Sequence, residues 1–175
     1  MNTATVTSTL TTLMSELVDG TPPTGGYMLN TGDEGLLRAL DRLSADDASQ
    51  IINGGSSIAA HVDHVTYYIS LMNRWSEGER PWRTADWGAS WRRTAVNDEE
   101  WLQLRRSFAE ELHKWMAVLK EPRDVESVEL TGMVASIVHL AYHLGAIRQM
   151  DRTLRGPSAR NEQDAFTGVS PSNHP

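Results

Sequence analysis

Apolar residues recur every three or four positions through four long stretches of the chain, which is the spacing of one face of an α-helix. The first stretch covers residues 7–18 and ends before a glycine and a Pro-Pro pair. The second covers residues 58–77, with Ser56 or Ser57 as the candidate N-cap and Gly78 as the stop. Both stretches outlast an ordinary β-strand, so we predict two helices.

The third and fourth stretches cover residues 98–120 and 124–154. Asn97 or Asp98 caps the third stretch, and acidic residues follow at the positive end of the helix dipole. Its apolar residues form one stripe: Trp101, Leu104, Phe108, Leu112, Trp115 and Leu119. The fourth stretch carries arginines near its negative end and stops at Gly156, so we predict two further helices.

Between the first two long helices, residues 36–43 form a short amphipathic segment that predicts a short extra helix. The pattern therefore predicts an all-α protein whose four long helices form an antiparallel four-helix bundle. We expect a single domain over residues 1–157. Residues 158–175 are polar and rich in Pro, Gly and Ser, so we expect a flexible tail.

Composition narrows the possible partners and sites. The 175 residues carry a net charge of −7, which gives no reason to expect binding to nucleic acid or to an anionic membrane. The chain has no cysteine, so a metal ion would need His, Asp or Glu ligands. The start of the chain does not resemble a secretion signal. No window contains the roughly 18 uncharged apolar residues that a membrane-spanning helix needs. We therefore expect a cytoplasmic protein.

Two pairs of histidines stand in these apolar helices. His139 and His143 are four residues apart, so they lie on one face about 6 Å apart along the axis and can converge on one ion. His61 and His64 are three apart on the second helix, and either can supply the next ligand. We favour His64 because it is more central in its helix.

The competing interpretation of these histidines is a set of core side chains paired by hydrogen bonds. Leaving one buried imidazole without a partner costs about 1–3 kcal/mol, and one shared ion removes that cost for several at once. We expect His113 to lie on the surface and leave aside His174, which is in the tail.

Three tryptophans, Trp82, Trp87 and Trp91, lie in a segment whose pattern is neither helical nor β. They predict a loop that is either anchored to the core by its aromatic rings or used to line a substrate pocket.

Three segments, "SSIAAHVDHVTYYISLMNRW", "PWRTADWGASW" and "VASIVHLAYHLGAIRQM", resemble the DinB/YfiT-like metalloenzyme superfamily. The resemblance covers residues 58–150, and its most specific part is the second-helix His followed by H-x3-H-x-G. It implies a four-helix bundle, often a homodimer, with a divalent metal ion bound by His64, His139 and His143. Many members carry a Gln soon after the last ligand, whereas the Gln here is Gln149.

These observations predict a divalent-metal-dependent enzyme acting on a small-molecule substrate, with zinc or nickel as the expected ion. Relatives that use low-molecular-weight thiols imply a thiol-dependent S-transferase, and a hydrolase fits equally well. Because the chain has no cysteine, an attacking thiolate would come from a small thiol cofactor. The alternatives are a stress-associated binding protein with a structural ion and a metal-free dimerising bundle.

Overall fold

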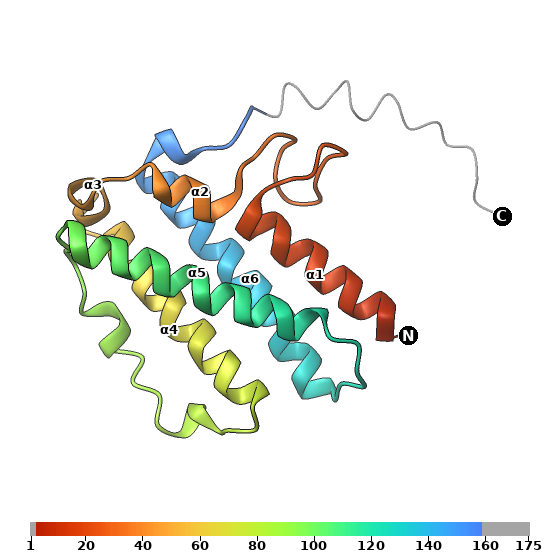
Figure 1. Cartoon of the computed structure of the whole chain (residues 1–175). Coiled ribbons are helices and arrows are strands. Elements are labelled where there is room, and N and C mark those ends of the chain that lie inside the picture. Colours follow the sequence, from red (N-terminus) through yellow and green to blue (C-terminus); the bar gives the residue numbers. More distant parts are fainter. Residues whose placement is uncertain (1–2, 159–175) are drawn as a thin grey trace.

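The computed structural model describes residues 3–158, which form a helical bundle and contain no β-strand (Figure 1). The α-helices are α1 (Thr3–Asp19), α2 (Gly35–Asp41), α3 (Ala45–Ser49), α4 (Ile58–Ser76), α5 (Asp98–Lys120) and α6 (Ser127–Met150). Three short 3-10 helices are η1 (Pro81–Arg83), η2 (Ala89–Trp91) and η3 (Arg152–Leu154). The all-α prediction is confirmed for this part of the chain, whereas the expected tail lies outside the described residues apart from Ser158.

Capping residues start two of the long helices where the sequence predicted. The Ser57 side chain accepts a hydrogen bond from the backbone N–H of Ala60 at the start of α4. Asn97 and Glu100 form a reciprocal capping box at the start of α5, which satisfies two backbone N–H groups that the helix leaves free.

One predicted helix boundary was wrong, and one short helix was not predicted. The fourth long helix ends at Met150, because Asp151 leaves the helical conformation and its side chain accepts from the N–H of Thr153 to start η3. The polar segment after residue 43 also contains a second short helix, α3. Ser44 and Asp47 form its capping box, so local hydrogen bonds build a helix turn that has almost no apolar pattern.

The long helices are not all antiparallel to their sequence neighbours, because α4 and α5 run in the same direction (Figure 1). Near the start of α5, the Trp101 indole N–H donates to the Leu43 carbonyl at 2.9 Å, beside α3, which also packs on α4. Further along both helices, the Asn73 amide donates to the Glu111 carbonyl at 3.0 Å. The connection over residues 77–97 returns along the bundle, and the antiparallel prediction is wrong for this pair.

The core lies between the four long helices. Its largest fully buried side chains include Trp115, Phe108, Met14, Leu17, Ile69, Met72, Leu112 and Leu140. The Trp115 indole N–H donates to the Ser136 hydroxyl at 2.8 Å, so the one polar atom of this buried ring has a partner. This bond joins α5 to α6.

Helix α6 is apolar on nearly every side. By length and composition alone, α6 could cross a membrane. This corrects the expectation that no window is long and apolar enough for a membrane span. A core helix of a soluble protein passes the same test, and α6 buries Met133, Ile137, Leu140 and Leu144 in the bundle. Its outer face carries Val138 and Tyr142, which are exposed by 62% and 70%.

The backbone at the end of α1 lies close to the backbone at the start of α2. Gly35 has a φ of 76°, and a Cβ there would lie 2.6 Å from the carbonyl oxygen of Val18. Gly54 has a similar φ of 71°, but a Cβ there would meet nothing within 4 Å. A substitution at Gly54 therefore tests backbone strain alone, whereas one at Gly35 adds steric overlap with the backbone.

We expect Gly54→Ala to lower the free energy of unfolding by about 1 kcal/mol, because an L-residue is strained at this φ. Gly35→Ala should lower it by about 1–3 kcal/mol more, because the added methyl group also overlaps backbone. Urea unfolding followed by circular dichroism measures both values. Equal losses in the two variants would contradict the proposed overlap.

Candidate metal centre

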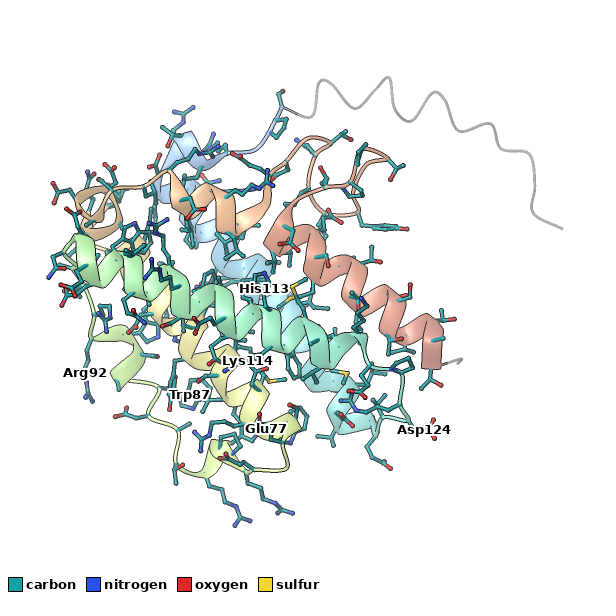
Figure 2. The ribbon with its side chains drawn as sticks, viewed as in Figure 1. Glu77, Trp87, Arg92, His113, Lys114 and Asp124 are labelled. Carbon is teal, nitrogen blue, oxygen red and sulfur yellow. The ribbon has the colours of Figure 1, made fainter. Side chains whose placement is uncertain are left out.

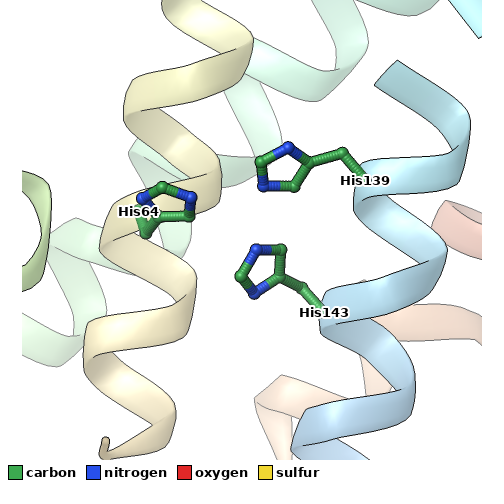
Figure 3. Close-up of side chains that lie close together, drawn as sticks. All are labelled: His64, His139 and His143. Carbon is green, nitrogen blue, oxygen red and sulfur yellow. The ribbon is translucent and has the colours of Figure 1, made fainter. Parts of the chain in front are cut away.

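Helices α4 and α6 pack side by side in opposite directions and bring three histidines together (Figure 3). His64 comes from α4, and His139 and His143 come from successive turns of α6. One ring nitrogen from each residue lies within 4.8 Å of the other two. The sequence predicted this set of three residues, and the structure brings them to one place.

The three rings present nitrogen atoms to the space between them (Figure 3). Their ring centroids are 4.6–5.2 Å apart. The Nε2 atom of His139 is buried and has no hydrogen-bond partner in the described part of the chain. Such an atom costs free energy unless another group binds it, and a cation held by three imidazoles would bind it here. The cluster can therefore bind a metal ion.

Hydrogen bonds on the outer side of the cluster orient two of the rings. The Nδ1 atom of His64 lies 2.9 Å from the Ser90 hydroxyl. The Nδ1 atom of His143 lies 2.8 Å from Nδ1 of His61. Because each imidazole has two nitrogens, using Nδ1 outward leaves Nε2 for the centre. His61 thus lies beside the three-histidine set as the partner of His143.

Burial keeps these imidazoles uncharged at neutral pH. His64 is 7% exposed and His143 is 2% exposed. Loss of solvent, with repulsion from neighbouring imidazoles, lowers the pKa of His64 to about 4 and that of His143 to about 3. Burial also lowers the pKa of His61 and His139. A neutral imidazole is the form that binds metal ions.

Aromatic side chains wall the cluster on two sides. The Trp91 ring stacks on His64 with centroids 4.3 Å apart, and the Tyr68 ring stacks on His139 at the same distance. Both aromatic residues restrict the rotation of the imidazoles and exclude water from one ring face. The sequence did not connect Tyr68 with the site, because the contact between the two helices decides which residue stacks on His139.

The predicted tryptophan loop lies against the cluster. Trp91 is part-buried against His64, as expected of an anchoring residue. Trp82 and Trp87 are 39% and 42% exposed, and their nearly parallel rings have centroids 6.2 Å apart. The loop is therefore anchored by one tryptophan and exposes the other two next to Tyr68, from which each ring centroid is 6.3–6.4 Å away.

Nearby acidic side chains face other partners. Asp63 accepts a hydrogen bond from Arg93 at 3.1 Å, and Glu111 accepts from the Asn73 amide at 2.7 Å. Glu110 is exposed. In residues 3–158 no carboxylate joins the three-histidine cluster, so its protein donors are imidazoles alone.

The remaining histidines lie apart from the site. His113 is exposed on α5 beside Lys114, as the sequence predicted (Figure 2). His174 lies outside the described residues.

Comparison with known proteins adds no relative: no family model, no curated protein and no solved structure matches this chain. The candidate site rests on the geometry of the histidines, and the resemblance to DinB/YfiT-like proteins stays a prediction.

The lowered histidine pKa values predict that acid destabilises the metal-free protein. Below about pH 6.5 the unfolded chain takes up protons on these histidines, whereas folded His64 and His143 stay neutral until about pH 4 and 3. This part of the stability is complete above pH 6.5 and is lost progressively as the pH falls. Urea unfolding in the presence of a chelator, between about pH 5 and pH 7.5, measures the slope.

Replacing His143 with Leu should reduce that slope, because the variant lacks a buried imidazole whose pKa is lowered. A stability that is flat over this pH range in the wild-type protein would contradict the assigned pKa shifts.

Proposed function

We propose that this protein is a divalent-metal-dependent enzyme whose ion is held by His64, His139 and His143. The observation that carries the proposal is the unpartnered, buried Nε2 of His139 in a cluster whose ligand nitrogens lie within 4.8 Å of one another. Zinc and nickel suit an all-imidazole donor set. The motif resemblance to DinB/YfiT-like proteins supports the same three residues.

The donor set favours catalysis over a structural ion. Structural zinc sites usually have four protein ligands, whereas catalytic sites keep three and leave a position for substrate or water. Among the described residues, only three histidines supply ligand atoms to this cluster. When bound, a divalent ion would act as a Lewis acid that lowers the pKa of a coordinated thiol or water.

The surrounding residues support this chemistry by holding and shielding the imidazoles. Ser90 and His61 bind the outer nitrogens of two rings, which keeps the inner nitrogens aimed at the centre. Burial raises the pKa of Tyr68, so its hydroxyl stays protonated and can donate a hydrogen bond to a bound substrate. Trp82 and Trp87 extend this aromatic wall to the surface, where a small molecule can reach it.

The expected reaction is transfer of a low-molecular-weight thiol or, as the second candidate, hydrolysis. The chain contains no cysteine, so a thiol substrate would supply the sulfur nucleophile. The homodimer implied by the resemblance, the small-molecule substrate and the cytoplasmic location remain predictions. The metal-free bundle is disfavoured because it leaves His139 Nε2 without a partner.

Metal content tests the ligand assignment. Protein purified without a His-tag should contain about one zinc or nickel ion per chain by elemental analysis. His64→Ala and His143→Ala should lose the ion, because each removes one of three ligands. His61→Ala should retain it with affinity reduced about 10–100-fold, because it removes only the partner of His143.

In the same experiment, His113→Ala is the matched control and should keep the wild-type metal content. Loss of metal from the His61 variant with retention in the His64 variant would reverse the assignment on α4. Wild-type metal content in both the His64 and the His143 variants would refute the site as located here.

Thiol-dependent turnover tests the reaction class. We expect the metal-loaded protein to conjugate a small thiol, such as mycothiol or bacillithiol, to an electrophile. His143→Ala should reduce the rate to that of chelator-treated protein. Absorbance of the thioether product measures the rate, and metal-dependent ester hydrolysis without conjugation by any of several thiols would select the hydrolase instead.

A further inference from the structure

Ser90 is a buried hydroxyl that connects the tryptophan loop to the histidine cluster. It is 5% exposed and lies in η2, outside the two helices that carry the histidines. Its Oγ atom is 2.9 Å from Nδ1 of His64 and 2.9 Å from the carbonyl oxygen of Trp87. Neither neighbour is a charged group. The hydrogen bonds among Ser90, His64 and the Trp87 carbonyl therefore depend on where the hydroxyl proton points and on which nitrogen of His64 carries the ring proton.

Only one assignment of the protons lets Ser90 make both of its hydrogen bonds. The hydroxyl has a single proton, and the Trp87 carbonyl can only accept, so Ser90 donates to Trp87. The hydroxyl oxygen then accepts from His64, which requires the proton of the neutral imidazole to be on Nδ1. The Nε2 atom of His64 is left with its lone pair and lies on the side of the ring that faces His139 and His143 (Figure 3).

The opposite tautomer breaks this set of bonds. With the proton on Nε2, the His64 Nδ1 atom would need a donor, and Ser90 could supply its proton only by releasing the Trp87 carbonyl. Among the described residues, no backbone N–H of the loop donates to that carbonyl. The inward N–H would also point toward the other two imidazoles and block binding of a cation.

We propose that Ser90 is a positioning residue that holds His64 in the Nδ1–H tautomer and thereby prepares Nε2 as a metal ligand before any ion arrives. The inference rests on the proposed metal site for its consequence, although the tautomer itself is a property of the metal-free protein. It also links the loop to the cluster: displacing the Trp87 carbonyl or Ser90 removes the group that selects the tautomer.

Histidine nitrogen NMR of the metal-free protein at about pH 7.5 tests the tautomer directly. Long-range proton–nitrogen correlations distinguish a protonated Nδ1 from a protonated Nε2, and the loss of one ring signal in His64→Gln assigns the residue. We expect the Nδ1–H form in the wild-type protein and in Ser90→Thr, which keeps the hydroxyl. Ser90→Ala should shift His64 toward the Nε2–H form.

The matched control is Ser70→Ala on α4, which removes a part-buried hydroxyl that donates to the Tyr67 carbonyl. It should leave the His64 tautomer unchanged. An Nε2–H form in the wild-type protein, or an unchanged Nδ1–H form in Ser90→Ala, would overturn the proposal. If the threonine methyl group disturbs the loop, the comparison of Ser90→Ala with Ser70→Ala still decides the outcome.

Zinc affinity, measured by competition with a chromophoric chelator, tests the consequence. Ser90→Ala should bind zinc about 10–100-fold more weakly than Ser70→Ala, the usual effect of removing the group that orients a ligating histidine. Equal zinc affinities of Ser90→Ala and Ser70→Ala would refute the proposal that Ser90 prepares the Nε2 atom of His64 for metal binding. Absence of zinc binding in the wild-type protein would instead refute the proposed function, while the NMR result would still test the role of Ser90.

Discussion

Burial of imidazoles between α4 and α6 is the constraint on which the rest of the site depends. Burial favours the neutral imidazole, but each buried ring nitrogen that lacks a hydrogen-bond partner or a ligand still costs about 1–3 kcal/mol. Here Ser90 and His61 compensate the outer nitrogens of His64 and His143. The inner side remains uncompensated at His139 Nε2, which is the physical reason to expect a cation in this space.

The direction of α5 explains why the tryptophan loop reaches this cluster. Since α4 and α5 are parallel, the chain has to return along the bundle between them, and residues 77–97 do so beside α4. A short hairpin between antiparallel helices would have left the side of His64 open to solvent. The long return instead packs Trp91 on the imidazole and places Ser90 at its outer nitrogen.

A second set of buried polar bonds holds the end of the bundle where α6 terminates. Asp33 is buried and accepts from Arg148 of α6 at 2.8 Å and from the N–H of Gly35 at 2.9 Å. The carboxylate of Glu16 accepts from three successive backbone N–H groups of residues 27–29. These bonds pair buried charges with donors, and they fix the loop between α1 and α2.

The sequence by itself determined the helical class and the four long helices, and it narrowed each of two N-caps to a pair of neighbours, Ser56 or Ser57 and Asn97 or Asp98, because helix periodicity and capping act over a few neighbouring residues. It also predicted that His139 and His143 share a face, since a four-residue spacing does so on any helix. Short elements such as α3 escaped prediction because their hydrogen bonds are local but their apolar pattern is almost absent.

Only the tertiary structure decided which histidine of α4 joins the pair on α6. His61 and His64 are equally plausible by spacing, and the rotation of α4 against α6 places His64 in the three-histidine set and His61 behind His143. The pattern predicted the wrong relative direction for α4 and α5, and it did not place Ser90 or the stacking of Tyr68 on His139. Each depends on contacts between segments far apart in the chain, and periodicity carries no information about such contacts.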